Sequence, residues 1–364
     1  MIAQIEPWID ESELLEIKRA VDNTFFTENK LTAEFEEMVR KYTGSKYALA
    51  VCNATVGLFC VLKALDIGPG DEVIVPDITF IATSNAVILA GATPVICDVK
   101  QDTFCIDPED IEKRITKRTK AIIPVHLYGQ SADMDSIMKI AQKYKLKVIE
   151  DAAQALGVNY IGKSAGTFGD AGVISFYGNK IITTGEGGII LTNNEEIYKK
   201  CYRLKNHGRD TKGTFIHEYI GFNFCFTDLQ AAVGISQMKK LPKIIQRKKE
   251  IFEKYKEGLK DIPYLKPAYI DPNCKPVYWF SNFIVENINE LVEFLKNSGI
   301  QTRRAFFPLH LQPCYKNTNY IKYEGEYKNS VFCYEKLLSL PSSYKIKEDE
   351  QELVISKIRE FYGY

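Results

Sequence analysis

The sequence lacks several features that would place it in a specialised class of proteins. No apolar run approaches the length of a membrane-spanning helix, and 47 Lys and Arg residues balance 47 Asp and Glu residues. A net charge of zero argues against a surface that binds nucleic acid or anionic lipid. The first seven residues contain no basic segment followed by an apolar one, so we expect no signal peptide. We therefore expect neither a membrane nor a nucleic acid as a partner.

Metal and disulfide patterns are also missing. The nine cysteines include no CxxC pair, and an odd, scattered set fits a reducing cytoplasm better than a disulfide scaffold or a zinc site. The four histidines lack metal-ligand spacing: His126, His207, His217 and His310. No GxSxG segment suggests a serine triad. We expect a cytoplasmic protein with no metal.

Strand-like and helix-like segments alternate through the first half of the chain. The β-rich runs are 47–52, 72–75, 94–97, 120–125, 147–149 and 172–176. Helical patterns lie at 11–21, 31–42, 56–65, 81–90, 108–115 and 134–144. This rhythm predicts an α/β fold with a mostly parallel sheet covered by helices on both faces.

The pattern changes in the second half. A charged helix is expected at 241–259, a strand at 279–285, and helices at 288–297 and 349–361. We therefore expect two domains: a large one at 1–241 and a small α+β one at 242–364. The N-terminal segment is expected to pack near the small domain. A length of 364 residues suits this division.

Ligands of such sheets bind beyond the carboxyl ends of the parallel strands. Polar or aromatic residues follow several predicted strands: Asn53, Asp77 to Phe80, Asp98, His126, Asp151 and Lys180. The sequence therefore predicts the edge of the sheet that carries the site.

Lys180 follows an apolar strand and stands in a glycine-rich segment, SFYGNKIITTGEGG at 175–188. A reactive lysine must be partly desolvated so that its amine is neutral often enough to attack a carbonyl. Asp151 ends another strand and could be a helix N-cap. A lysine and an acid so placed suit a pyridoxal phosphate enzyme, with Lys180 as the Schiff-base lysine and Asp151 at the pyridine nitrogen. Glu150 would face the opposite side of its strand and is the weaker candidate.

The segment 53–57 opens a helix, where backbone N–H groups and the Thr55 hydroxyl could hold a phosphate. Thr55 is equally suited to be a plain cap. Ser175 could supply a further hydroxyl. Phe80 could belong to the core, or it could stack on a pyridine ring.

Taken together, these motifs resemble those of the DegT-type (StrS-like) sugar aminotransferases, pyridoxal phosphate enzymes of the aspartate-aminotransferase fold (fold type I). The resemblance covers nearly the whole chain. It rests on PGDEVIVP at 69–76, VHLYG at 125–129, EDAAQ at 150–154, GTFGD at 166–170, the segment 175–188, LKNHG at 204–208 and TDLQAA at 227–232.

The resemblance implies a role for each site residue. Lys180 would be the Schiff-base lysine and proton shuttle, Asp151 would pair with the pyridine nitrogen, and Gln154 would lie against the ring oxygen. The remaining cofactor contacts would come from Ala54, Thr55 and Ser175 at the phosphate, Phe80 on the ring, and Asn223 of a neighbouring subunit. His310 would approach the substrate. A homodimer with shared active sites follows from the role of Asn223.

Two positions depart from the family pattern. The usual glycine of the phosphate loop is Ala54, and a frequent arginine after Asn223 is Cys225. Lys180 argues against the dehydratase branch of the family, which has histidine there. We expect amino transfer from glutamate to a ketone of a nucleotide-linked sugar. The alternatives are an aminotransferase for a smaller phosphorylated ketone, and a non-catalytic pyridoxal phosphate-binding regulator or scaffold.

Overall fold

The large sheet of the protein has seven strands. A computed structural model describes residues 1–211, 213 and 215–364. The strand order is β1-β9-β8-β5-β4-β2-β3, and β9 is antiparallel to both of its neighbours, whereas the pairs from β8 to β3 are all parallel. The strands are β1 (Tyr47–Val51), β2 (Glu72–Pro76), β3 (Thr93–Cys97), β4 (Thr119–Ile122), β5 (Lys147–Asp151), β8 (Ala171–Ser175) and β9 (Gly188–Thr192). The predicted mostly parallel α/β fold is confirmed.

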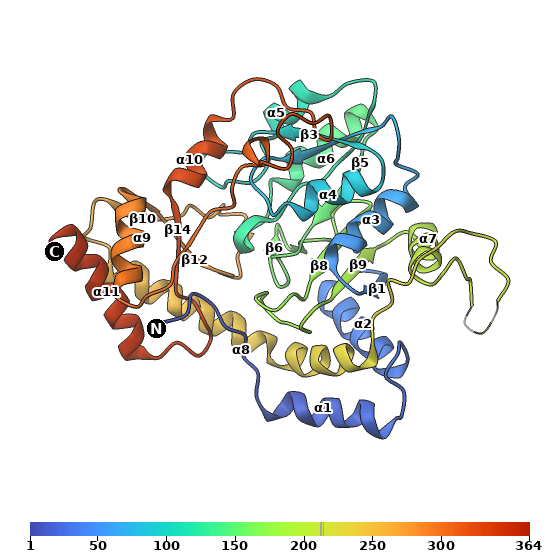
Figure 1. Cartoon of the computed structure of the whole chain (residues 1–364), viewed down its shortest axis with the longest axis horizontal. Helices are drawn as coiled ribbons and strands as arrows, with labels where there is room; N and C mark the ends of the chain where they lie inside the picture. Colours follow the sequence, from blue (N-terminus) through green and yellow to red (C-terminus); the bar gives the residue numbers. More distant parts are fainter. Residues whose placement is uncertain (212, 214) are drawn as a thin grey trace.

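Helices cover both faces of this sheet (Figure 1). One buried cluster joins the sheet to α3 (Ala54–Ala64), α4 (Ala82–Leu89) and α7 (Glu195–Lys205). A second joins the other face to α2 (Lys30–Thr43), α6 (Met134–Tyr144) and part of α8 (Asp228–Gly258). The strands are buried almost throughout, which explains their β-branched, nearly continuous apolar sequences.

Helix α8 runs for 31 residues, begins at the N-cap Thr227 and forms a capping box with Gln230. The predicted start of a helix at residue 241 is wrong, because one helix continues across Pro242. A mid-helix proline removes one backbone hydrogen bond but does not end a helix held by packing on both sides. Helices α1 (Glu11–Asp22) and α2 pack against α8 (Figure 1).

The second half of the chain builds a four-stranded antiparallel sheet in the order β10-β12-β14-β13. The strands are β10 (Leu265–Pro267), β12 (Ser281–Val285), β13 (Arg303–Arg304) and β14 (Leu337–Leu340). Helices α9 (Ile288–Asn297) and α11 (Glu348–Tyr362) share a buried cluster with this sheet and with the end of α8.

The remaining elements are short. They are α5 (Pro108–Arg114), α10 (Lys328–Lys336), the 3-10 helices η1 (Leu127–Gly129) and η2 (Leu309–Leu311), and the small sheet of β11 (Cys274–Lys275), β6 (Asn159–Tyr160) and β7 (Lys163–Ser164). The N-terminal segment reaches the second sheet region, where the Ile2 N–H donates to the Gly299 carbonyl at 2.8 Å. The division into two domains at 241/242 stays a prediction, and that boundary falls inside α8. No helix of the described residues is long and apolar enough to cross a membrane.

Candidate active site

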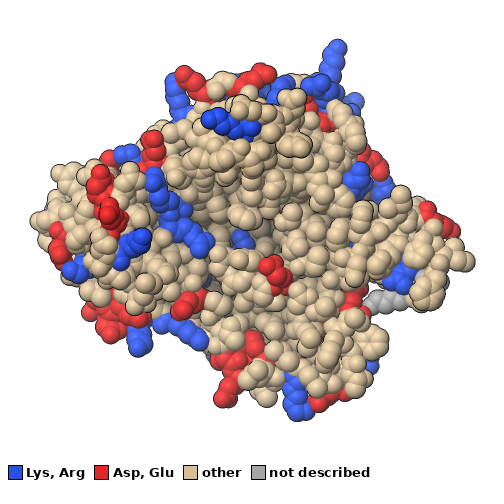
Figure 2. Space-filling model, viewed as in Figure 1, with Lys and Arg blue, Asp and Glu red and all other residues tan. Residues whose placement is uncertain are grey.

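A cavity of about 520 Å³ lies at the carboxyl ends of β1, β2, β5 and β8. This volume falls within the range of small-molecule sites in proteins. Figure 2 shows a hollow near the centre of one face, with Lys or Arg side chains in and beside it. Seven of the residues predicted for the site line this one cavity: Ala54, Thr55, Phe80, Asp151, Gln154, Ser175 and Lys180.

The start of α3 forms one wall of the cavity. Asn53 is the N-cap, and its side chain accepts the Val56 N–H at 3.0 Å. The N–H groups of Ala54 and Thr55 precede the first intrahelical bond, so they remain available to an anion. Gly188 in β9 allows this approach, because a Cβ there would lie 2.6 Å from the Ala54 nitrogen. The hydroxyl-bearing residues Thr55 and Ser175 also line the cavity.

Asp151 stands at the end of β5 with its carboxylate anchored on one side. The Thr83 hydroxyl donates to Oδ2 at 2.7 Å, and the Ala153 N–H donates to Oδ1 at 3.1 Å. No helix follows Asp151, so it is not a helix N-cap. Its carboxylate is oriented without a cationic partner among the described residues, and it remains available to a cationic group in the cavity.

Glu150 takes the opposite side of β5, as its strand position predicts. Its carboxylate accepts N–H groups from Gly166, Phe168 and Gly169 at 2.6 to 2.7 Å. It also accepts Nε2–H of His126 at 2.8 Å, because the Ala132 N–H donates to Nδ1 and thereby fixes the neutral tautomer. Glu150 therefore holds a loop in place and does not line the cavity.

Lys180 projects its amine toward the indole ring of Trp279, with Nζ 4.3 Å from the ring centroid. The indole N–H donates to the Asn179 carbonyl at 2.7 Å, which fixes the ring beside the lysine. Burial lowers the pKa of Lys180 to about 8, Asp151 opposes this shift, and Arg303 adds to it. At pH 7.5 about a quarter of the amine is then neutral, against about one part in a thousand for an ordinary lysine.

Two further predicted residues have contacts that suit a flat, polar ligand. The Tyr128 N–H donates to Gln154 Oε1 at 2.7 Å, which leaves the amide NH₂ of Gln154 to donate elsewhere. Phe80 is 56% exposed although it follows a buried strand, so it is not a core residue. Its ring lies 6.0 Å from that of Phe306, and both line the cavity.

Several cavity residues were not predicted from the sequence. Trp279, Arg303 and Phe306 come from the second half of the chain, and Tyr177, Asn179 and Glu186 flank Lys180. The glycine-rich segment pointed to the last three, because all lie within 175–188. Nothing local marks the first three, which reach the cavity only through the tertiary fold.

Asn223 and His310 lie outside the cavity. Asn223 is exposed and forms an isolated bridge with Asn206. His310 donates from Nδ1 to Asp77 at 2.6 Å and stacks on Tyr327, with 4.5 Å between the ring centroids. Their predicted roles, at a neighbouring subunit's cofactor and near the substrate, stay predictions.

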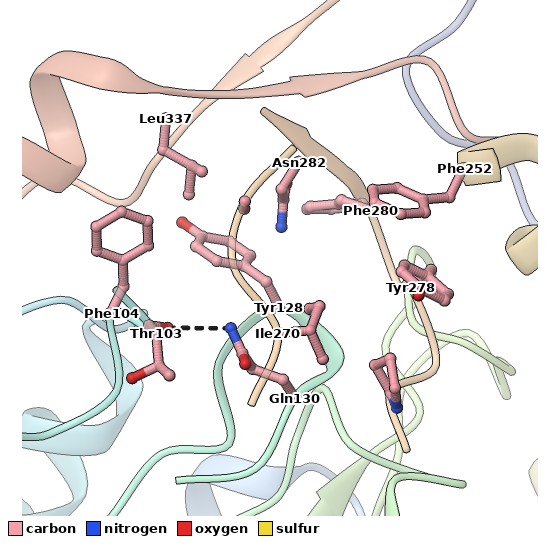
Figure 3. Close-up of a pocket in the computed structure, with 12 residues that line it drawn as sticks. Thr103, Phe104, Tyr128, Gln130, Phe252, Ile270, Tyr278, Phe280, Asn282 and Leu337 are labelled. Carbon is pink, nitrogen blue, oxygen red and sulfur yellow. Dashed lines mark hydrogen bonds between the residues drawn. The ribbon is translucent and has the colours of Figure 1, made fainter. Parts of the chain in front are cut away.

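A second, much smaller cavity of about 20 Å³ is lined by Tyr128, Gln130 and other residues drawn in Figure 3. Gln130 faces it and donates to the Thr103 carbonyl at 3.2 Å. The space suits one water molecule, so it is no second ligand site. Among the described residues, no group of three His, Cys, Asp or Glu side chains is placed to hold a metal ion.

Comparison with known proteins identifies the chain's relatives. The model of the DegT/DnrJ/EryC1/StrS aminotransferase family matches residues 7–359. GDP-perosamine synthase of Caulobacter vibrioides is 36% identical over 365 residues, which cover 98% of this chain and 97% of the relative.

Solved structures extend these findings. DesV of S. venezuelae, in complex with a ketimine intermediate, has a TM-score of 0.91, 32% identity, and coverage of 97% of this chain and 94% of its own. A putative sugar aminotransferase of Streptococcus pneumoniae, in its PLP form, has a TM-score of 0.93 and 28% identity, with coverage of 100% and 98%. The predicted aspartate-aminotransferase-like fold and family resemblance are confirmed.

Proposed function

Because this chain belongs to the DegT/DnrJ/EryC1/StrS aminotransferase family, we propose that it transfers an amino group from glutamate to a nucleotide-linked sugar ketone. A 4-keto-6-deoxyhexose is the proposed sugar. That the protein is an aminotransferase follows from its family. The observation that carries the site assignment is the convergence of Lys180, Asp151 and the start of α3 on one cavity.

The cavity residues fit pyridoxal phosphate. The free N–H groups of Ala54 and Thr55, with the hydroxyls of Thr55 and Ser175, would hold its phosphate. Asp151 would hold a proton on the pyridine nitrogen. The Gln154 NH₂ would donate to the ring oxygen, and Phe80 would cover the ring. When bound, this cofactor serves as an electron sink and carries the amino group between two half-reactions.

Lys180 supplies the acid–base chemistry in this proposal. Its amine would hold the cofactor as a nucleophile and would then serve as the base for the α-proton of the donor. The same amine would return a proton in each half-reaction. The apolar cover of Trp279 keeps the amine partly desolvated, which suits a base that works near neutral pH.

Arg303 supports an anionic substrate. It is exposed, lines the cavity, and has no ion-pair partner among the described residues. Its guanidinium lies 5.3 Å from the Phe280 ring centroid, which orients it without neutralising it. A carboxylate of the donor or a phosphate of the acceptor would pair with this group.

We also propose a homodimer and a cytoplasmic location. The segment that carries Asn223 exposes large apolar side chains, namely Phe215, Ile216, Ile220 and Phe222. Burial against a second copy would remove them from water. All nine cysteines are free thiols in the described structure, which suits a reducing compartment.

The test begins with the cofactor-loaded protein. Glutamate is added until the visible absorbance of the bound cofactor is lost, and the donor is then removed. Nucleotide-linked 4-ketosugars and small keto-phosphates are added separately, and the return of the absorbance is followed. Recovery with a ketosugar, with an amino sugar found by mass spectrometry, is the expected result. Recovery with keto-phosphates alone would replace the proposed acceptor by the smaller phosphorylated ketone.

The Lys180→Ala variant tests the assignment of the base. We expect its turnover to fall at least about a thousandfold, because both the nucleophile and the proton carrier are lost. A Lys139→Ala variant removes an exposed lysine on α6 and is expected to behave as wild type. Near-normal turnover of Lys180→Ala would contradict the assignment.

A further inference from the structure

Helix α8 carries a lysine buried in a place where it has no charged partner. Lys248 is 3% exposed, and among the described residues no carboxylate forms an ion pair with it. Its amine donates to two backbone carbonyls, those of Trp279 at 3.0 Å and Ser342 at 2.9 Å. Burial lowers the pKa of Lys248 to about 7. A buried amine with only carbonyl partners is costly, so its contacts call for an explanation.

These contacts join three parts of the fold. Lys248 belongs to α8, Trp279 precedes β12, and Ser342 follows β14. Polar side chains near these contacts form few hydrogen bonds. In the described structure the buried hydroxyls of Ser281, Ser342 and Ser343 have no hydrogen-bond partner. Lys248 and these serines therefore form a small buried polar cluster where α8, the segment before β12 and the segment after β14 meet.

The segment that carries Trp279 is not regular secondary structure and depends on such contacts. Tyr278 has φ of +42°, a conformation that a tyrosine adopts only when its surroundings impose it. On the preceding side, the Val277 N–H donates to the Gly129 carbonyl at 3.0 Å. On the following side, the Lys248 amine supplies the donor for the Trp279 carbonyl.

The other end of Trp279 faces the candidate catalytic amine. The indole N–H bonds to Asn179, and the ring centroid lies 4.3 Å from Lys180 Nζ. We propose that Lys248 is a positioning residue for the reaction: by holding the Trp279 carbonyl, it keeps the indole ring over Lys180 and keeps water away from that amine. This inference rests on the proposed role of Lys180.

The test measures the reactivity of the Lys180 amine directly and does not require catalytic turnover. The full chain without added cofactor is treated with acetic anhydride across pH 6.5 to 10, and acetylation of the Lys180 peptide is followed by mass spectrometry. In Lys248→Met the indole cover loosens, so we expect the pKa of Lys180 to rise by about one unit. At pH 7.5 its acetylation rate then falls about five- to tenfold. Lys248→Arg keeps the donors and is expected to remain close to wild type.

Lys240→Met is the matched control, because Lys240 is another buried lysine of α8. It bonds to Glu13 and Asp10 and lies beside Trp8, so its loss should disturb the protein without moving the pKa of Lys180. Equal shifts in Lys240→Met and Lys248→Met would overturn the proposal. If Lys248→Met does not fold, Lys248→Gln replaces it: its shorter side chain does not reach both carbonyls, so the pKa of Lys180 should rise in the same direction but by less.

A double-mutant comparison separates positioning from a simple effect of charge. In a Trp279→Leu background the ring is absent, so Lys248→Met should add little further shift. An undiminished shift there, or a folded Lys248→Met variant with an unchanged pKa for Lys180, would refute the inference. Because no arm measures amino transfer, the proposed acceptor and donor could be wrong without affecting this result.

Discussion

Glu150 and Asp151 are neighbours in β5, yet their carboxylates face opposite sides of the sheet and have different kinds of partner. Glu150 accepts three backbone N–H groups and the His126 ring N–H in a closed environment. Asp151 accepts the Thr83 hydroxyl and one N–H and also lines the cavity. Glu150 thus supports the fold, whereas Asp151 is available for chemistry in the cavity.

This division predicts opposite outcomes for two isosteric changes. Asp151→Asn should lower turnover about 100- to 1000-fold with little loss of stability, because an amide cannot hold the pyridine nitrogen in its protonated form. Glu150→Gln places an amide NH₂ against donors and should lower the free energy of unfolding by about 3 kcal/mol. Chemical denaturation and turnover per folded molecule distinguish the two. The reverse pattern would exchange the roles assigned here.

The lowered pKa of Lys180 predicts how the rate of cofactor capture depends on pH. Its pKa is lowered to about 8, and only the neutral amine attacks a carbonyl. The rate constant for capture of pyridoxal phosphate by the cofactor-free protein should therefore rise with pH and level off above about 8. Stopped-flow absorbance at constant ionic strength measures this rate. A midpoint near 10.5, the ordinary value for lysine, would show that the amine is not desolvated in solution.

Arg303 predicts a change in substrate affinity. Arg303→Gln should raise the KM of the substrate whose anion it binds about ten- to a hundredfold, because a charge-assisted hydrogen bond is lost. Measured KM values for donor and acceptor identify which anion that is. Arg303→Lys keeps the charge but not the planar fork, so an intermediate effect is expected. Unchanged KM values for both substrates would remove Arg303 from the binding site.

Lys248 predicts a pH dependence of stability. Its pKa is about 7 in the folded protein and near 10.5 when unfolded, so between these values the unfolded chain binds more protons. Its contribution to stability should then rise with pH across this window, by up to about 1.4 kcal/mol per pH unit. Urea midpoints at pH 7.5, 8.5 and 9.5 should rise more steeply for wild type than for Lys248→Met. Parallel slopes would contradict the low pKa.

Local sequence patterns were sufficient to predict most strands of the parallel part of the large sheet. Strands followed by helix caps or glycine-rich turns, such as the one before Asn53, are signalled within a few residues. Strand β9 (Gly188–Thr192) was not predicted: its first residue ends the glycine-rich segment, and the apolar run that follows is short. It also breaks the parallel pattern, which the βαβ rhythm does not reveal.

Seven residues from the first half of the chain that line the candidate site were predicted, whereas none of those from the second half was. Lys180 and Asp151 carry signals in their own strand ends, and the structure brings both to one cavity. Trp279 and Arg303 have no such signal in the sequence around them. They reach the cavity only because the four-stranded sheet packs beside the large one. The helix predicted at 241–259 begins earlier in the structure, at Asp228, and packing of α1 and α2 against it is not visible in the local sequence.

Pro242 has a consequence for the exchange of backbone amides with solvent deuterium. With no N–H of its own, it leaves the Met238 carbonyl without its usual helical donor. Although Leu241 and Ile244 are packed in the same cluster as Ile235, the missing hydrogen bond should let amides around this position open more readily than those near Ile235 or Ile251. Peptide-level exchange should therefore divide one continuous helix into two protected halves, each belonging to the sheet beside it.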